Sequence, residues 1–448
     1  MNSFTLEKGL DLPLAGAPHM EVEDAPEVGR VALIGLDYPG MRPTMEVSEG
    51  DRVRLGQVLF SDKKNPRVVY TSPGSGRIRA INRGEKRVFL SIEIELDGKD
   101  EESFARHPES HLANLERDLV VETLLASGLW TALRRRPFGR IPVPGEVPRA
   151  VFITAIDTHP LAPDPCVAIA ERADDFSSGV KVLSTLTDGP LYLCTAPDAK
   201  LPDCCSAAQR ATFSGPHPAG LPGTHIHHLS PVGLRHAVWH LGYQDVCAVG
   251  HLFTQGRIST ARILSLAGPG VKRPRLVRTR IGACIDDLTR KELESPDLRV
   301  LSGSVLHGRA ARGPLAFLGR YHNQVTALEE GVQGSALGWL RPGGDDFSLR
   351  GLFKGAFDRQ RLRRLTTAQG GAHRAIYPIG TYEQVFPLEL PITYLLRALE
   401  VGDMEEALAL GCLELDEEDL ATCTFACPGK NDFGPMLREM LDQIEKEG

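Results

Sequence analysis

The residues with the clearest potential for redox chemistry lie near the C-terminus, in the segment DEEDLATCTFACPGK (416–430). Cys423, Cys427 and the proline after them match the end of a C-x2-C-x2-C-x3-C-P run, in which thiolates hold an iron–sulfur cluster. The two earlier cysteine positions of that run fall on Glu417 and Leu420. Two of the four cluster ligands are therefore missing.

The same cysteines also fit a structural interpretation. Leu420, Cys423 and Cys427 recur at the i, i+3 and i+7 spacing of one helix face, and free cysteine packs as a small hydrophobe. Adding the nearby Cys412 would give three thiolates, and a carboxylate as the fourth ligand would make an unusual cluster site. The sequence favours core cysteines over cluster ligands.

The run Thr224-His225-Ile226-His227-His228 is the strongest candidate for a metal site. On a strand, neighbouring histidines point to opposite sides, and no carboxylate or cysteine partner lies at a ligand spacing. We expect a loop or strand whose histidines are solvated or hydrogen-bonded, and we predict no metal ligand.

Nucleotide-binding and hydrolase motifs are missing from the sequence. Gly429-Lys430 precedes Asn431 and lacks the upstream glycine of a phosphate-binding loop. No G-x-G-x-x-G motif opens a helix after a strand, and G-x-S-x-G does not occur. We therefore predict neither a catalytic residue nor a cofactor-binding residue.

Composition limits the classes of function. The 448 residues include 42% hydrophobic and 24% charged residues, which is ordinary for a globular chain. A net charge of −7 argues against nucleic-acid binding. No signal peptide or membrane-spanning stretch is visible, and nine cysteines without framework spacing suit a reducing compartment. We expect a cytoplasmic, soluble chain that needs a partner if it works at a membrane.

The elements that would position these residues begin with a strand-rich unit at 28–96, punctuated by Pro- and Gly-containing turns. This unit resembles the biotinyl/lipoyl carrier fold, whose carrier lysine follows an aspartate on an exposed hairpin. Asp62-Lys63 occupies that place, but the chain continues with Lys64-Asn65-Pro66. Lys63 is therefore expected to be an exposed turn charge rather than a carrier lysine.

The rest of the chain mixes strands and helices. We expect one helix over 109–128 that ends at Gly128, with Leu112, Leu115, Leu119 and Leu124 on one face. An α/β layer follows over about 149–254, with strands at 149–156, 179–186 and 190–196 and a helix-like segment at 234–242. An α+β pattern spans 255–330. The last 70 residues are expected to be mostly helical, with Pro391 at a first helical position, caps at Asp403 and Asp416, and stops at Gly411 and Gly429.

Several long stretches resemble one family. EKGLDLPLAGAP, GMRPTMEVSEGDRV, GQVLFSDKKNP, INRGEKRV, GRISTARILSLAGPGVKRP and GCLELDEEDLATCTFACPGK are similar to the A-type subunit of the Na⁺-translocating NADH:quinone reductases. The resemblance runs from about residue 5 to the end of the chain. It implies a peripheral subunit on the cytoplasmic face of the bacterial inner membrane, held there by an integral membrane subunit of a six-subunit complex. That complex (EC 7.2.1.1) reduces ubiquinone with NADH and exports Na⁺.

This family is similar in turn to the C-type subunit of the Rnf electron-transport complex and to the flavin-binding subunit of respiratory complex I. In those relatives a glycine-rich loop cradles FMN, and cysteine motifs hold clusters. The matching region here is TALRRRPFGR (131–140), in which arginines and Phe138 replace the glycines. We therefore expect this subunit to hold no cofactor. The flavins, iron centres and NADH and ubiquinone sites are expected on or near other subunits.

The resemblance also sets the expected architecture, a multidomain α/β and α+β chain. It implies a barrel-sandwich hybrid at 1–100, a helix plus a Rossmann-like α/β domain at 101–254, a β-grasp-like domain of the soluble-ligand-binding type at 255–330, and a mostly helical domain at 331–448.

Two roles remain for such a subunit. One is structural or regulatory, near the quinone site, and the alternative is direct ubiquinone binding. For quinone or partner contact the best candidates are Tyr38, Met41 and Arg42 in the loop GLDYPGMRPTM (35–45), which offer a stacking ring, an adaptable apolar surface and a donor to a carbonyl. The arginines at 134–136 are expected at a solvated helix end, where acidic lipid headgroups or an acidic partner could meet them.

Overall fold

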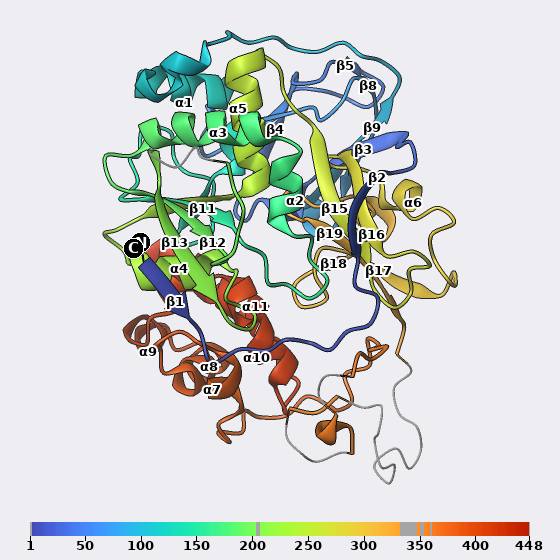
Figure 1. The fold of residues 1–448 in the computed structure, drawn as a ribbon, viewed down its shortest axis with the longest axis vertical. Helices are drawn as coiled ribbons and strands as arrows, with labels where there is room; N and C mark the ends of the chain where they lie inside the picture. The colour runs from blue at the N-terminus through green and yellow to red at the C-terminus, as the bar shows by residue number, and fades with distance from the viewer. Residues whose placement is uncertain (1, 203–206, 332–346, 350–353, 359–360, 448) are drawn as a thin grey trace.

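The structure is a computed structural model, and it describes residues 2–202, 207–331, 347–349, 354–358 and 361–447. Four sheets and a C-terminal group of helices make up this part of the chain (Figure 1). Part of the expected domain at 331–448 lies outside the described residues. The expected domain boundaries stay a prediction, and the first 24 residues contribute strands β1 (Asn2–Thr5) and β2 (His19–Asp24) to two sheets outside the rest of the N-terminal unit.

Two small antiparallel sheets form the N-terminal unit, as its turn-punctuated strands predict. The larger contains, in spatial order, β3 (Arg30–Ile34), β9 (Phe89–Leu96), β8 (Gly76–Arg83) and β5 (Arg52–Val53). The smaller contains β4 (Pro43–Met45), β6 (Val58–Asp62) and β7 (Val69–Thr71). The sheets pack together through buried aromatic rings, since the Phe60 ring centre lies 5.2 Å from that of Phe89. Lys63 lies exposed in the turn after β6, as expected.

The central sheet has six strands and is parallel except at one edge. In spatial order these are β1 (Asn2–Thr5), β13 (Gln209–Ser214), β12 (Leu191–Thr195), β11 (Val151–Ala155), β14 (Val238–Gly242) and the antiparallel β10 (Arg134–Arg136). Neighbouring strand residues point to opposite faces. Ile153 packs with helices α3 (Ala173–Leu183) and α5 (Tyr243–Gln255), whereas Phe152 packs with α4 (Pro222–Leu229). Helices therefore cover both faces of this sheet.

A second six-stranded sheet is mixed in direction. Its order is β18 (Arg309–Ala310), β17 (Leu298–Ser302), β19 (Gln324–Glu329), β15 (Ala261–Ala267), β16 (Arg275–Arg280) and β2 (His19–Asp24). Helix α6 (Ile285–Leu288) packs against it. Strands β15 and β16 and the short helix α6 after them agree with the α+β pattern expected over 255–330.

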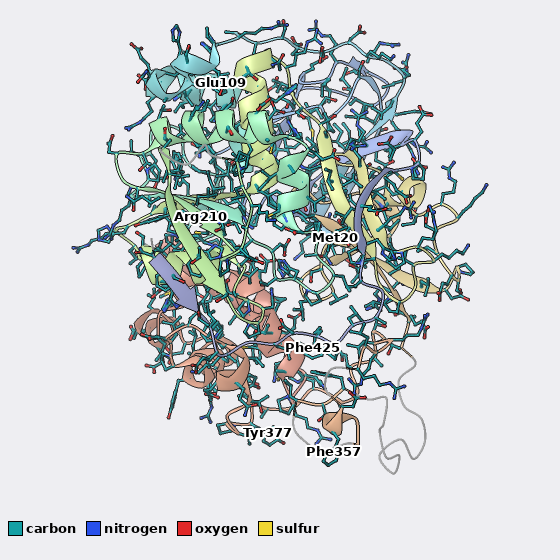
Figure 2. All side chains as sticks on the ribbon, in the orientation of Figure 1. Met20, Glu109, Arg210, Phe357, Tyr377 and Phe425 are labelled. Atoms are coloured by element: carbon teal, nitrogen blue, oxygen red, sulfur yellow. The ribbon has the colours of Figure 1, made fainter. Side chains whose placement is uncertain are left out.

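The C-terminal helices pack below the central sheet (Figure 1). They are α7 (Thr381–Val385), α8 (Ile392–Val401), α9 (Met404–Ala409), α10 (Ala421–Ala426) and α11 (Phe433–Glu447). Asp403 and Asp416 cap helical turns with their side chains, as predicted, whereas Pro391 is an N-cap and not a first helical residue. Among the described helices, none has the length and apolar character of a membrane span. Figure 2 shows the exposed side chains of Phe357, Tyr377 and Phe425 at this same end of the molecule.

Two elements of the α/β layer were predicted with the wrong type. Residues 179–186, expected as a strand, lie mostly in α3, where Phe176, Val180 and Leu183 repeat at helical spacing and are buried. Residues 234–242, expected as a helix, contain β14, whose apolar run is buried on both faces. Such a buried parallel strand does not show the alternation that identifies half-buried strands.

The helix expected over 109–128 is shorter than predicted. Within this range a 3-10 turn (Glu109–Asn114) comes first and α1 (Arg117–Ala126) follows. A separate short helix, α2 (Pro165–Ala170), lies before α3. Leu119 is exposed, so the predicted leucine face is wrong at that residue. Gly128 does take the left-handed conformation, with a φ of 76°, directly after α1. The predicted stop is therefore confirmed.

Candidate functional site

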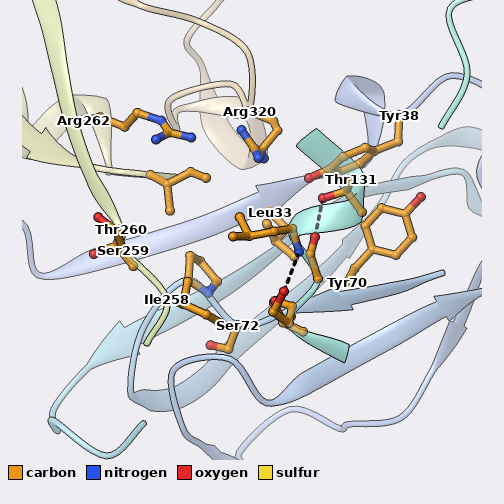
Figure 3. A pocket seen from close by; sticks show the side chains of 16 residues that line it. Leu33, Tyr38, Tyr70, Ser72, Thr131, Ile258, Ser259, Thr260, Arg262 and Arg320 are labelled. Atoms are coloured by element: carbon orange, nitrogen blue, oxygen red, sulfur yellow. Dashed lines mark hydrogen bonds between the residues drawn. The ribbon is translucent and has the colours of Figure 1, made fainter. Parts of the chain in front are cut away.

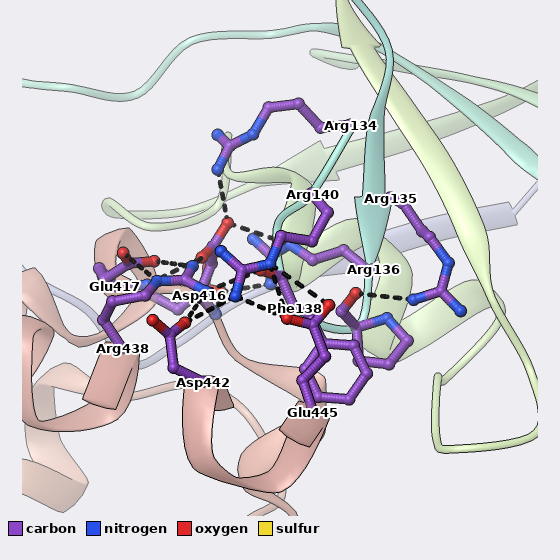
Figure 4. Close-up of polar contacts among 12 residues, drawn as sticks. Arg134, Arg135, Arg136, Phe138, Arg140, Asp416, Glu417, Arg438, Asp442 and Glu445 are labelled. Atoms are coloured by element: carbon purple, nitrogen blue, oxygen red, sulfur yellow. Dashed lines mark hydrogen bonds and ion pairs between the residues drawn. The ribbon is translucent and has the colours of Figure 1, made fainter. Parts of the chain in front are cut away.

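The arginines of 134–136 do not lie at a solvated helix end. They form strand β10, which pairs antiparallel with β14, and Arg136 is 1% exposed. Arg135 turns to Glu146, with 2.9 Å between its Nε and Oε1. The other two arginines point toward the C-terminal helices (Figure 4). The acidic partner of this run is therefore part of the same chain.

The carboxylates of Asp416 and Asp419 form ion pairs with these two arginines. They belong to a capping box, in which the Asp419 carboxylate accepts a hydrogen bond from the Asp416 backbone N–H at 2.8 Å. Both side chains are 3% exposed. A local helix-starting motif thus holds two carboxylates in fixed positions beneath the central sheet.

Five side chains make a network that we call the arginine clamp: Arg134, Arg136, Asp416, Asp419 and Arg438. The side chains of Arg136, Asp416 and Asp419 are at most 3% exposed, and those of Arg134 and Arg438 are 20% and 16% exposed. Arg136 donates to Asp419 at 3.0 Å and lies 3.4 Å from Asp416, which Arg134 contacts at 2.8 Å. Arg438 of α11 contacts Asp416 at 2.8 Å and donates to the Phe138 carbonyl at 2.7 Å. The clamp joins an edge strand of the central sheet to the C-terminal helices (Figure 4).

The charge of the clamp keeps its central carboxylate ionised. Burial alone would raise the pKa of Asp416, but Arg136 and then Arg134 hold that pKa well below its ordinary value. The Arg136 pKa is raised because Asp416 and Asp419 outweigh the effect of burial. Asp416 therefore stays charged, whereas burial raises the pKa of Asp419 against the attraction of Arg136.

A second set of ion pairs lies beside the clamp. Arg140, four residues after Arg136, contacts both Asp442 and Glu445 of α11 at 2.7 Å. His159 lies between Asp157 at 2.7 Å and Glu418, in the turn before α10, at 2.8 Å. These pairs extend the contact between the central sheet and the C-terminal helices in two directions.

The C-terminal cysteines are core residues, as the sequence favours. Cys412, Cys423 and Cys427 are each 0% exposed, and burial raises the pKa of the Cys412 thiol to about 12. The single helical face expected for Leu420, Cys423 and Cys427 is wrong, because Cys427 is the C-cap of α10 and has an extended ψ of 116°. Its sulfur lies 3.1 Å from the Tyr382 hydroxyl.

The histidine run is helical rather than extended. Pro222 starts α4, and His225 is fully buried, donating from Nε2 to the Ala219 carbonyl at 3.0 Å. Nδ1 of His227 lies 2.7 Å from Glu414. Within the described ranges, no three His, Cys, Asp or Glu side chains are grouped as a metal site would require.

A cavity lies where the N-terminal unit meets the segment directly after α1 and the second six-stranded sheet (Figure 3). Tyr38 lines it and is 3% exposed, with its ring between those of Tyr70 at 4.7 Å and Tyr321 at 6.2 Å. The predicted quinone or partner contact also included Met41 and Arg42. Met41 packs partly buried against the core, and Arg42 is exposed. The structure therefore brings only Tyr38 to this cavity.

Comparison with known families matches three parts of the chain. Residues 4–97 match the NqrA N-terminal barrel-sandwich hybrid domain, 115–258 the NqrA second alpha/beta domain, and 263–313 the NQRA C-terminal domain.

Curated relatives match the whole chain. The A-type subunit of the Na(+)-translocating NADH-quinone reductase of Hahella chejuensis is 53% identical over 99% of both chains. Those of Shewanella denitrificans and Serratia proteamaculans are 51% and 52% identical over 99% of this chain and at least 99% of their own. The chain belongs to the family of A-type subunits of the Na⁺-translocating NADH-quinone reductases. A solved NAD⁺-reducing [NiFe]-hydrogenase covers 51% of the chain at 12% identity, with a TM-score of 0.36.

The clamp occupies both places where this A-type subunit departs from the cofactor motifs of its wider resemblance. The strand in the region that the resemblance matched to a glycine-rich flavin loop supplies Arg134 and Arg136, and Glu417, at an expected cluster-ligand position, pairs with Arg438 at 2.6 Å. A Cβ on Gly139 would lie 2.9 Å from the Asp416 carboxylate oxygens. The residues present therefore do not fit a flavin phosphate or a cluster.

The sequence reasoning for this A-type subunit missed the clamp, although it singled out both halves. Three consecutive arginines and the run Asp416-Glu417-Glu418-Asp419 are opposite charge clusters about 280 positions apart. The opposite charge of these two runs was the signal that could have predicted the clamp. Solvent exposure was assumed for the arginines, since most charge runs lie on the surface.

Proposed function

We propose that this chain is a structural or regulatory subunit of the Na⁺-translocating NADH:ubiquinone reductase and holds no redox cofactor of its own. The observation that supports it is the arginine clamp. Buried ion pairs fill the two regions in which flavin and cluster motifs are expected, and they tie the central sheet to the C-terminal helices. Such a network gives a rigid body suited to holding other subunits in place.

The proposal includes the setting of the subunit. It sits on the cytoplasmic face of the inner membrane, held by an integral membrane subunit of a six-subunit complex that oxidises NADH, reduces ubiquinone and exports Na⁺. The flavins and iron centres lie on other subunits. Support comes from the relatives at 51–53% identity, whose names give them as the A-type component of such a reductase.

The finer fold assignments also belong to this proposal. The order β13-β12-β11-β14, all parallel with helices on both faces, supports a Rossmann-like middle domain. The mixed sheet with its single short helix supports a β-grasp-like third domain.

The alternative is that this subunit binds ubiquinone directly. Tyr38 favours it, because this candidate contact residue lines a cavity beside two arginines. The cavity offers only about 50 Å³, whereas a cavity of roughly 150 Å³ is needed to hold a benzene-sized ring. A quinone ring would require the three surrounding units to move apart, and the structural role is therefore preferred.

Photo-crosslinking with a ubiquinone analogue in the intact complex separates the two roles. For the structural role we expect the label on other subunits, with no peptide of this chain labelled above the level seen with excess competing ubiquinone. A competable label on the peptide that contains Tyr38 would establish the alternative. Tyr38→Phe serves as the matched variant, because it keeps the ring and removes only the hydroxyl.

A further inference from the structure

The cavity wall contains more positive than negative charge. Arg262 of β15 and Arg320 of the loop before β19 share one carboxylate, that of Asp245 at the start of α5. The side chains of the three residues are 5%, 4% and 9% exposed. Within the described residues no second carboxylate pairs with either arginine. Two buried cations against one anion leave an excess of one positive charge.

One of these guanidiniums has a free donor at the cavity. Arg320 uses Nη1 for both Asp245 oxygens, at 2.9 and 3.0 Å, whereas its Nη2 is buried without a hydrogen-bond partner in the described structure. A buried unpaired donor on a charged group costs more than one on a neutral group. Figure 3 shows both guanidiniums at one side of the cavity, with the Tyr38 hydroxyl end pointing toward Arg320. Arg320 lines the cavity, and its Nη2 is the donor left unpaired beside it.

The chemistry of the wall suits an anion. Burial lowers the pKa of Arg262, and the neighbouring Arg320 adds to this effect against the attraction of Asp245. Arginine nevertheless stays charged in proteins, so the excess charge is not removed by loss of a proton. The rest of the wall combines apolar side chains, including Leu33, Ile258 and Ile281, with hydroxyl-bearing residues such as Thr131 and Thr260.

Size limits the ligand. The space of about 50 Å³ holds only a few water-sized particles, each of which needs at least roughly 10–15 Å³. A halide ion fits this space, and its single negative charge matches the excess. Aromatic rings are too large for this space, and multiply charged oxyanions carry more negative charge than the excess positive charge.

We propose that this interdomain cavity is a binding site for a small monovalent anion of halide size, held by Arg320 Nη2 with the Tyr38 hydroxyl as a second donor. The bound anion neutralises the Arg262–Asp245–Arg320 group and so stabilises the meeting point of the three units. This site does not depend on the redox role of the complex.

Bromide provides the test with the purified full chain. Thermal unfolding is followed while sodium bromide replaces sodium gluconate at constant ionic strength, and crystals grown in bromide are examined for anomalous scattering. We expect saturable stabilisation by bromide and an anomalous peak beside Arg320. A response no larger than that of gluconate, or crystals in which the cavity holds no bromide, would overturn the proposal.

Variants assign the effect to the cavity. Arg320→Met leaves Arg262 and Asp245 as a neutral pair and should weaken bromide binding by at least about tenfold, because a charge-assisted hydrogen bond is lost. Tyr38→Phe preserves the packing of the ring and should weaken binding by a smaller factor. Arg52→Met, at the exposed pair with Asp97, should leave bromide binding unchanged. Bromide binding that survives in Arg320→Met at full strength would contradict the assignment.

Discussion

Arg136 donates a hydrogen bond from Nη1 to the Asp419 carboxylate at 3.0 Å, and neither side chain is more than 3% exposed. One residue belongs to an edge strand of the central sheet and the other to the C-terminal helices. This pair therefore fixes two parts of the chain that lie 283 positions apart in sequence.

Removing the arginine of this pair should destabilise the fold strongly. Arg136→Met leaves Asp419 and part of the Asp416 charge buried without compensation, for which we expect a loss of about 3–5 kcal/mol in the free energy of unfolding. Chemical unfolding followed by circular dichroism measures it. Limited proteolysis should at the same time release the C-terminal helices sooner than in the unaltered chain.

The exposed pair Arg67–Glu122 provides the matched control. Its side chains are 55% and 64% exposed, so Arg67→Met should cost at most about 1 kcal/mol. Adding Asp419→Asn to Arg136→Met should recover part of the loss, because the buried charge is removed while an amide oxygen still accepts the Asp416 N–H. Equal stabilities of Arg67→Met and Arg136→Met would contradict the clamp.

Buried neutral histidines should make the protein sensitive to acid. Burial lowers the pKa of His225 to about 3, against an ordinary value of 6.5. Between pH 6.5 and 3 the unfolded chain therefore binds a proton that the folded chain does not bind. The free energy of unfolding falls as the pH drops from 6.5 toward 3, by about 1.4 kcal/mol per pH unit. His225→Gln retains a donor for Ala219 and should reduce this slope by one proton, as measured by denaturant midpoints over that pH range.

His159 should have the opposite pH dependence. Burial opposes its protonation, but Asp157 and Glu418 together raise its pKa well above 6.5. Its stabilising contribution is complete below the unfolded pKa of 6.5 and is lost as the pH rises through the elevated folded pKa. His159→Gln should therefore be less stable than the unaltered chain at slightly acid pH and converge with it at alkaline pH. Parallel stability curves for the two proteins would show that folding does not shift the His159 pKa and would contradict this prediction.

The cysteine at the third cluster position should behave as a core residue. Burial raises the pKa of the Cys423 thiol, which is 0% exposed, so a thiol reagent should label it only after unfolding. Cys423→Ser buries a hydroxyl and should cost about 1–3 kcal/mol. Cys166→Ser, at a partly exposed thiol, is the control and should change stability little. Rapid labelling of Cys423 in the native chain would contradict its burial.

Local signals predicted much of the fold. The caps at Asp403 and Asp416, the left-handed Gly128 and the turn-punctuated N-terminal strands follow from short-range backbone chemistry. The errors at 179–186 and 234–242 arose where tertiary burial overrides periodicity. Val180 and Val182 favour strands, yet they lie in α3, which approaches α5 so closely that a Cβ on Gly250 would meet the Asp175 carbonyl oxygen at 1.8 Å.

The candidate site was beyond sequence reasoning for a different reason. The missing cluster ligands at Glu417 and Leu420 can be read directly from the sequence. The contact between Arg136 and Asp419 depends on how the edge of the central sheet packs against the C-terminal helices, and no local sequence pattern predicts that packing. Pro222 was a usable signal that was missed, because a proline at a first helical position predicts α4 and so the burial of His225.

The central claim is that the arginine clamp occupies the places of the flavin and the cluster. The flavin and iron content of this subunit, separated from the intact reductase under mild conditions and examined by visible absorption and metal analysis, tests it most directly. We predict no flavin band and no iron–sulfur absorption, with flavin and iron recovered on the remaining subunits. A stoichiometric flavin or cluster on this chain would contradict the account.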